Sequence, residues 1–138
     1  MSEANKAAMR DILRIFETGD LTGVESLIAP NAVDHQGMPG VDTQGIEGFK
    51  RIVTIMHTAF PNIHLHIEDL IAEGDRVVAR SEMHARNTGP FMDQPATDKE
   101  IEAEAIDIIR FENGMAVEHW GISDDLKMMQ QLGLIPPM

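Results

Sequence analysis

The chain has 138 residues, 43% of them hydrophobic, which is enough to bury one core and predicts a single domain over residues 1–138. Its 23 acidic residues outnumber its 11 basic ones, and the net charge of −12 opposes binding to nucleic acid or anionic membranes. The absence of Cys excludes disulfides, thiolate nucleophiles and Cys-bound metals. The charged first 14 positions and the lack of a long apolar run favour a cytoplasmic protein.

Hydrophobic periodicity predicts three helices in the first half of the chain. They are expected at residues 9–16, 24–28 and 46–60. Gly19, Pro30 and Pro61 mark the ends of these helices, because glycine and proline terminate helical segments. A brief strand is expected at residues 32–34, before an irregular stretch rich in glycine.

After Pro61 the apolar spacing changes from helical to alternating, which predicts strands. The strands are expected at residues 63–68, 77–85, 101–111 and 115–122, and a last helix at 124–132. The loop at residues 87–99 carries Phe91 and Met92, apolar enough to fold over the mouth of a pocket. Helices followed by consecutive strands predict an α+β fold with a curved antiparallel sheet and the N-terminal helices on its concave side. The space between the two layers is the expected ligand site.

Several short stretches occur in a characteristic order and spacing. They are VDH at 33–35, GIEGFK at 45–50, TGPFM at 88–92 with PAT at 95–97, EHWGISD at 118–124 and QQLG at 130–133. Over nearly the whole chain they resemble the SnoaL-like polyketide cyclases of the nuclear-transport-factor-2-like superfamily. The resemblance implies a cone-shaped sheet, a pocket for a small organic ligand, and an intramolecular aldol step that closes a ring without metal or cofactor.

The resemblance also implies where the site lies. The catalytic aspartate of the family aligns with Gly121, which has no side chain, so the family's mechanism does not transfer intact. A pocket histidine of the family aligns with Asp107, and an asparagine aligns with Asp34. The positions expected to line the pocket are Phe16, Asp34, Met56, Phe60, Phe91, Met92, Ala105 and Gly121.

Asp107 is the only ionisable residue in an otherwise apolar row of the strand at 101–111, a setting that favours an acid/base role, although a structural role is about as frequent there. A two-residue turn at Asn113-Gly114 would set Asp107 opposite Trp120, and a three-residue loop at 112–114 would set it opposite His119. The resemblance favours the second register. An Asp107–His119 pair would orient the imidazole and keep its proton exchange near physiological pH.

Other polar residues have weaker signals. His35 follows the strand at 32–34, where the resemblance implies a pocket position, and it is a third catalytic candidate beside Asp107 and His119; a surface loop histidine is the alternative. Asp124 is expected to cap the last helix. His64 and His66 could bind a metal, but no third ligand is spaced to join them, so a solvated face is expected and no metal site is assigned.

Three functions fit these residues. The first is a cofactor-free cyclase- or isomerase-like enzyme that acts on a small apolar carbonyl compound through Asp107 and His119. The second is a hydrolase of the epoxide-opening kind, and the third is a binding domain without catalysis, for which Gly121 is the best argument. If His119 points inward, Trp120 points outward beside Ile106 and Ile108, and a homodimer through that face is expected.

Overall fold

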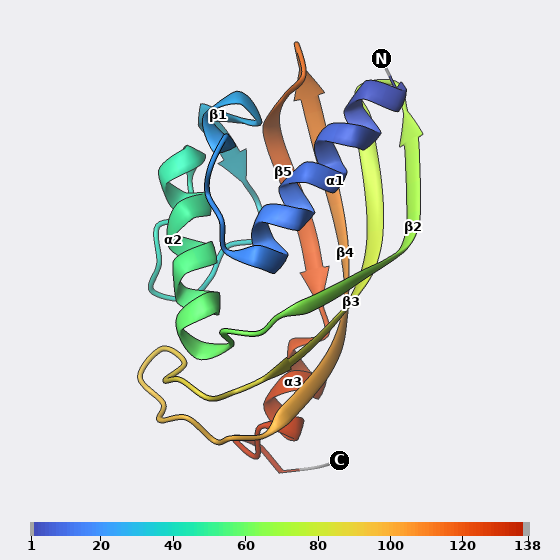
Figure 1. The fold of residues 1–138 in the computed structure, drawn as a ribbon. Coiled ribbons are helices and arrows are strands. Elements are labelled where there is room, and N and C mark those ends of the chain that lie inside the picture. Colours follow the sequence, from blue (N-terminus) through green and yellow to red (C-terminus); the bar gives the residue numbers. More distant parts are fainter. Residues whose placement is uncertain (1, 137–138) are drawn as a thin grey trace.

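The computed structural model describes residues 2–136 and has the expected α+β architecture (Figure 1). The helical elements are α1 (Ser2–Thr18), the short 3-10 turn η1 (Val24–Ser26), α2 (Gly45–Ala59) and α3 (Asp125–Gln131). The strands are β1 (Ile28–Asp34), β2 (His64–Glu73), β3 (Arg76–Arg86), β4 (Glu100–Glu112) and β5 (Met115–Ser123). None of the helices in this described part of the chain is long and apolar enough to cross a membrane.

The prediction of a helix at residues 24–28 is wrong for the second half of that segment. Only Val24–Ser26 is helical, and β1 begins at Ile28. Ile28 is paired with Ala116 of β5, and the Ala116 amide donates to the Leu27 carbonyl at 2.8 Å. Pairing with a distant strand therefore overrides the helical spacing of three apolar residues, which is a weak local signal.

The sheet has the strand order β1-β5-β4-β3-β2. Strands β2 to β5 pair antiparallel, as the alternating segments after Pro61 predict. Strand β1 adds a parallel partner at the β5 edge, a pairing that the sequence did not reveal. This parallel pairing places Asp34 beside His119, and neighbouring partners in a sheet point to the same face.

Helices α1 and α2 lie on the same face of the curved sheet, with α1 crossing β2 and β3 and α2 beside β1 (Figure 1). Two clusters of buried apolar side chains fill the space between helices and sheet. Both helices contribute to both clusters, so one helical layer covers one inner face.

The inner face of the sheet is polar between the two apolar clusters. On β4, Ile109 and Phe111 belong to the first cluster, and Ile101 and Ala103 belong to the second. Asp107 lies between these two pairs on the same side of the strand. A polar strip thus crosses the middle of the inner face, and it continues onto β5 and β1.

Candidate functional site

A bulge in the β4–β5 hairpin sets the direction of the candidate catalytic side chains. The turn at Asn113-Gly114 has two residues, both with positive φ (51° and 79°), as a type I′ turn requires. The pairing then shifts by one residue at Val117, between the Phe111–Ala116 and Arg110–Glu118 pairs. An extra residue on one strand is a β-bulge, and it turns all later side chains of that strand to the other face.

The bulge makes both expected registers wrong and still brings the expected pair together. Asp107 lies opposite Gly121, not opposite Trp120 or His119. Because the inserted residue restores the inward direction of position 119, His119 reaches Asp107 diagonally, and its Nε2 lies 2.8 Å from Asp107 Oδ1. The predicted pair is therefore present, through a bulge in place of a three-residue loop.

His119 also contacts a second carboxylate. Its Nδ1 lies 2.8 Å from Asp34 Oδ1, on the neighbouring parallel strand. An ionised carboxylate is only a hydrogen-bond acceptor, so two such bonds require a hydrogen on both ring nitrogens. The imidazole is thus held as a cation between Asp34 and Asp107. The three side chains are 12% to 29% exposed, so they are reachable from solvent without being free in it.

The protonation state of His119 follows from these contacts. Burial lowers its pKa, but the hydrogen bonds from His119 to Asp107 and Asp34 outweigh this effect and raise the pKa to about 9. The sequence-based expectation of proton exchange near physiological pH is therefore wrong for the imidazole itself. The second carboxylate causes the difference, and its position depends on the parallel β1–β5 pairing.

Asp34 is the most firmly held member of the group. Its carboxylate accepts bonds from the backbone N–H groups of Gln36 (3.2 Å) and Gly37 (3.1 Å). Burial raises the pKa of Asp34, but the bonds from His119, from Thr43 and from these backbone groups hold it well below its ordinary value. The Gln44 side chain bonds both the N–H and the C=O of Asp34, at 2.8 and 2.9 Å, and fixes the end of β1.

Gly121 pairs with Asp107 across the strands, and side chains of other residues fill the space that a side chain at position 121 would occupy. A Cβ at this position would overlap Gln36 Oε1 and would lie 2.8 Å from Asp107 Oδ1. The Gln36 amide reaches this space from the segment after β1 and donates to Ser123 Oγ at 3.2 Å. Gln36 and Gln44 have no signal in the sequence, because neither lies in a regular element whose periodicity would reveal the direction of its side chain.

His35 lies apart from this group. It follows Asp34, so it points to the outer face, where its ring stacks on Trp120 with centroids 5.0 Å apart. Its Nε2 is 2.6 Å from Glu118 Oε2. The sequence prediction grouped His35 with Asp107 and His119, but the structure places it on the opposite side of the sheet. The alternation of side chains along β1 and β5 is the reason.

The residues expected to line a pocket have different surroundings. Met56, Phe60 and Phe91 are buried in the second apolar cluster, with the rings of Phe60 and Phe91 5.7 Å apart; Phe16 is packed against that cluster. Ala105 is half-buried on β4, and Met92 is 45% exposed on the loop. An enclosed pocket lined by these residues stays a prediction.

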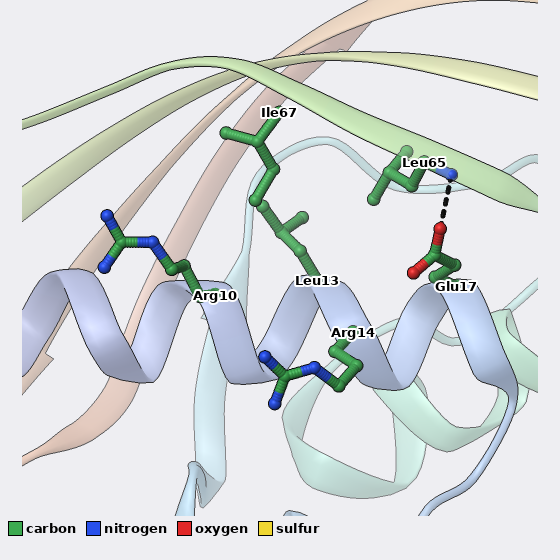
Figure 2. A pocket seen from close by; sticks show the side chains of 6 residues that line it. All are labelled: Arg10, Leu13, Arg14, Glu17, Leu65 and Ile67. Atoms are coloured by element: carbon green, nitrogen blue, oxygen red, sulfur yellow. Dashed lines mark hydrogen bonds between the residues drawn. The ribbon is translucent and has the colours of Figure 1, made fainter.

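Two open cavities lie elsewhere, next to the end of α1. The first has a volume of about 160 Å³ between α1 and β2, with Leu13, Leu65 and Ile67 as its apolar wall. Figure 2 shows Arg10, Arg14 and Glu17 along the helix side of this cavity, and a hydrogen bond of 2.7 Å from the Leu65 amide to Glu17. The second is lined by Glu17, Thr18, Pro61, Asn62, Ile63 and His64. Neither contains a residue of the Asp34–His119–Asp107 group.

Comparison with known proteins identifies the class of protein to which this fold belongs. The family model of the SnoaL-like polyketide cyclases matches residues 6–132. The chain therefore belongs to this family.

Individual relatives agree with this assignment. The aklanonic acid methyl ester cyclase DnrD of Streptomyces peucetius is 28% identical over 132 residues, which cover 91% of this chain and 88% of DnrD. The structure of a candidate polyketide cyclase from Bacillus cereus ATCC 10987 is 34% identical, with a TM-score of 0.81 over 93% of this chain and 79% of that one. The structure of IdmH from Streptomyces antibioticus is 29% identical, with a TM-score of 0.81 over 94% of this chain and 98% of IdmH.

Proposed function

We propose that this chain is a cofactor-independent enzyme that closes a ring in a small polyketide-like carbonyl compound, with Asp107 as the acid/base. The observation that carries the proposal is the position of the Asp107 carboxylate. Its Oδ1 lies 2.8 Å from the point that the first side-chain atom of residue 121 would occupy. The carboxylate of this chain thus reaches, from the adjacent strand, the place where the family resemblance puts its catalytic aspartate.

The three polar residues then have separate roles. Asp34 is fixed by backbone hydrogen bonds and anchors His119. The His119 imidazolium holds Asp107 Oδ1, and among residues 2–136 it is the only hydrogen-bond partner of that carboxylate, so Oδ2 remains available to a substrate. A carboxylate held by a cation on one side and open on the other is suited to take a proton and return it.

The proposed reaction is an isomerisation in which all atoms balance. Asp107 removes a proton from the carbon next to a substrate carbonyl, which gives an enolate. The enolate carbon attacks a second carbonyl carbon of the same molecule, a carbon–carbon bond forms, and that oxygen becomes an alkoxide. The alkoxide takes the proton back from Asp107. No oxidant, reductant or co-substrate is needed, and the fixed His119 charge stabilises the ionised Asp107 between turnovers.

The test starts from a compound of the class named for a relative, aklanonic acid methyl ester, and from related aromatic polyketides. Binding is screened by thermal shift, since a ligand that binds the native state stabilises it. Turnover is then followed by chromatography. We expect Asp107→Asn to lower kcat by a factor of about 10² to 10⁴.

Asp69→Asn is the matched control, because Asp69 lies on the outer face, where it pairs with Arg80 at 2.7 Å. This variant should keep wild-type turnover. Normal turnover by a folded Asp107→Asn variant would refute the role of Asp107. Tight binding without turnover by the wild type would instead favour a noncatalytic binding domain. The structural argument for that alternative is that Gln36 fills the space which a catalytic side chain at position 121 would occupy.

We also propose that the chain forms a homodimer through the outer face of the sheet. Ile122 is 80% exposed and pairs across the strands with Ile106, which is 48% exposed. Val33, on the neighbouring β1, is 45% exposed. Large apolar side chains gathered on one sheet face are typical of an interaction surface, and a second copy of the same face is the simplest complement.

A further inference from the structure

A second group of chemically active side chains lies on the outer face of the sheet, on strands β2, β3 and β4. The register of these strands sets the residues in two rows. One row is His64, His84 and Glu102, and the next is His66, Glu82 and Glu104. The sequence offered His64 and His66 without a third ligand. In the folded sheet, further candidate ligands lie on the next two strands, Glu82 and His84 on β3 beside β2, and Glu102 on β4 beside β3.

The distances within this group suit a metal ion. One ligand atom from each of Glu82, His84 and Glu102 lies within 4.8 Å of the others. His84 Nε2 is 2.6 Å from Glu82 Oε1, and His84 Nδ1 is 3.9 Å from Glu102 Oε2. These two contacts use different nitrogens of the His84 ring, and only one of them can bind a given ion. The half-buried Glu82 and the exposed His84 and Glu102 therefore have to rotate to reach the spacing of about 3 to 3.5 Å that ligand atoms have around zinc. His64 is the direct cross-strand partner of His84, about 5 Å away at Cβ, and its ring would join as a fourth ligand after turning toward the other three residues.

The charges around the group favour a cation. Arg80 is paired with Asp69 (2.7 Å) and Glu104 (3.2 Å). Arg86 is paired with Glu100 at 2.9 Å. Within residues 2–136, the salt bridges of Glu82 and Glu102 lead only to His84. Two carboxylates without an arginine or lysine partner, on a protein of net charge −12, attract a divalent cation.

We propose that Glu82, His84 and Glu102, with His64 as the fourth ligand, bind a divalent transition-metal ion such as Zn²⁺. Imidazole nitrogen and carboxylate oxygen are both zinc ligands, and two carboxylates balance the charge of the ion. The bound ion would join three strands close to the loop at residues 87–99 and thereby brace that end of the sheet. The site is separate from Asp107 and His119, so its presence does not depend on the proposed reaction.

The experiment is a zinc titration of the full chain after treatment with a chelator, followed by calorimetry and by thermal unfolding. We expect one ion per chain and a rise in Tm, because a ligand that binds only the native state stabilises it. His84→Gln and Glu102→Gln should each lower the zinc affinity by at least about tenfold. His64→Gln should weaken binding as well, and an unchanged affinity would refute its role as fourth ligand.

His35→Gln is the matched control. It removes another His–Glu pair of 2.6 Å from the same face, but there the carboxylate of Glu118 is already paired with Arg110 at 3.0 Å. Zinc affinity should not change in this variant. Circular dichroism without zinc checks that each variant folds. The proposal is overturned if the wild type shows no saturable binding, or if folded His84→Gln binds zinc as tightly as the wild type.

Discussion

His119 carries a positive charge at neutral pH because both of its ring nitrogens face carboxylate oxygens, at 2.8 Å each. This charge determines how His119 interacts with the Asp107 carboxylate. A neutral histidine could take a proton from a substrate, whereas this imidazolium has both N–H groups committed to Asp34 and Asp107. In the proposed reaction it therefore acts as a fixed cation that orients the Asp107 carboxylate, and the proton that moves passes between the substrate and Asp107.

The pH dependence of stability tests this charge. The pKa of His119 is raised from its ordinary value of 6.5 to about 9 in the folded protein. A raised pKa favours the protonated folded form, so the stabilisation is complete below pH 6.5 and is lost as the pH rises through about 9. The unfolding free energy of the wild type, relative to His119→Gln, should therefore decrease between pH 5.5 and 9.5, by on the order of 2 kcal/mol because the side chain is partly exposed.

Urea denaturation of both proteins at several pH values in this range measures the difference. His66→Gln is a suitable control, since the His66 side chain is 73% exposed on the outer face and has one carboxylate neighbour at 3.8 Å. Its pH profile should match that of the wild type. A difference between wild type and His119→Gln that did not vary with pH would mean that His119 is neutral in the folded protein.

At the scale of elements, the loop at residues 87–99 is held by one buried side chain. Asn87 is 1% exposed and donates to the carbonyls of Ala59 (3.2 Å) and Gly89 (2.8 Å). Its Oδ1 accepts from the backbone N–H and the hydroxyl of Thr97, both at 2.9 Å. One amide thus connects the end of α2 to both ends of the loop.

Asn87→Ala should destabilise the fold by about 2 to 4 kcal/mol, because it leaves several buried polar groups without partners. Asn87→Asp is the informative companion variant. Asp keeps the acceptor for Thr97 but cannot donate to Ala59 and Gly89, so it should be destabilised too. Chemical denaturation measures both. If Asn87→Asp were as stable as the wild type, the bonds to the two carbonyls would not hold the loop.

The sequence predicts the elements better than it predicts their partners. The alternation after Pro61 is a local signal, and it indicates all four antiparallel strands and the inward direction of Asp107. The bulge at Val117 has no such signal, because an extra residue in one strand can be recognised only from the pairing of that strand with its neighbour. For the same reason the position of Asp34 beside His119, and that of His84 beside His64, depend on pairings between distant segments.

At the scale of the whole molecule, the two faces of the sheet have different roles. The inner face is covered by α1 and α2 (Figure 1). It carries the Asp34–His119–Asp107 group between two apolar clusters. The outer face has apolar residues around Ile106 and Ile122 and the His–Glu group towards the ends of β2, β3 and β4. The same strands position both, because side chains alternate between faces.

The proposed dimer depends on the apolar residues of this outer face. Ile122→Glu combined with Ile106→Glu places two charges on the exposed apolar pair, where a like-charged second copy would oppose them. We expect the wild type to be a dimer at micromolar concentration and this variant to be a monomer, as measured by sedimentation or light scattering. Leu126→Glu is the control, because Leu126 is similarly exposed, at 52%, but lies on α3 and not on the sheet. This variant should remain a dimer. A monomeric wild type, or a double variant that remained a dimer, would contradict the proposed interface.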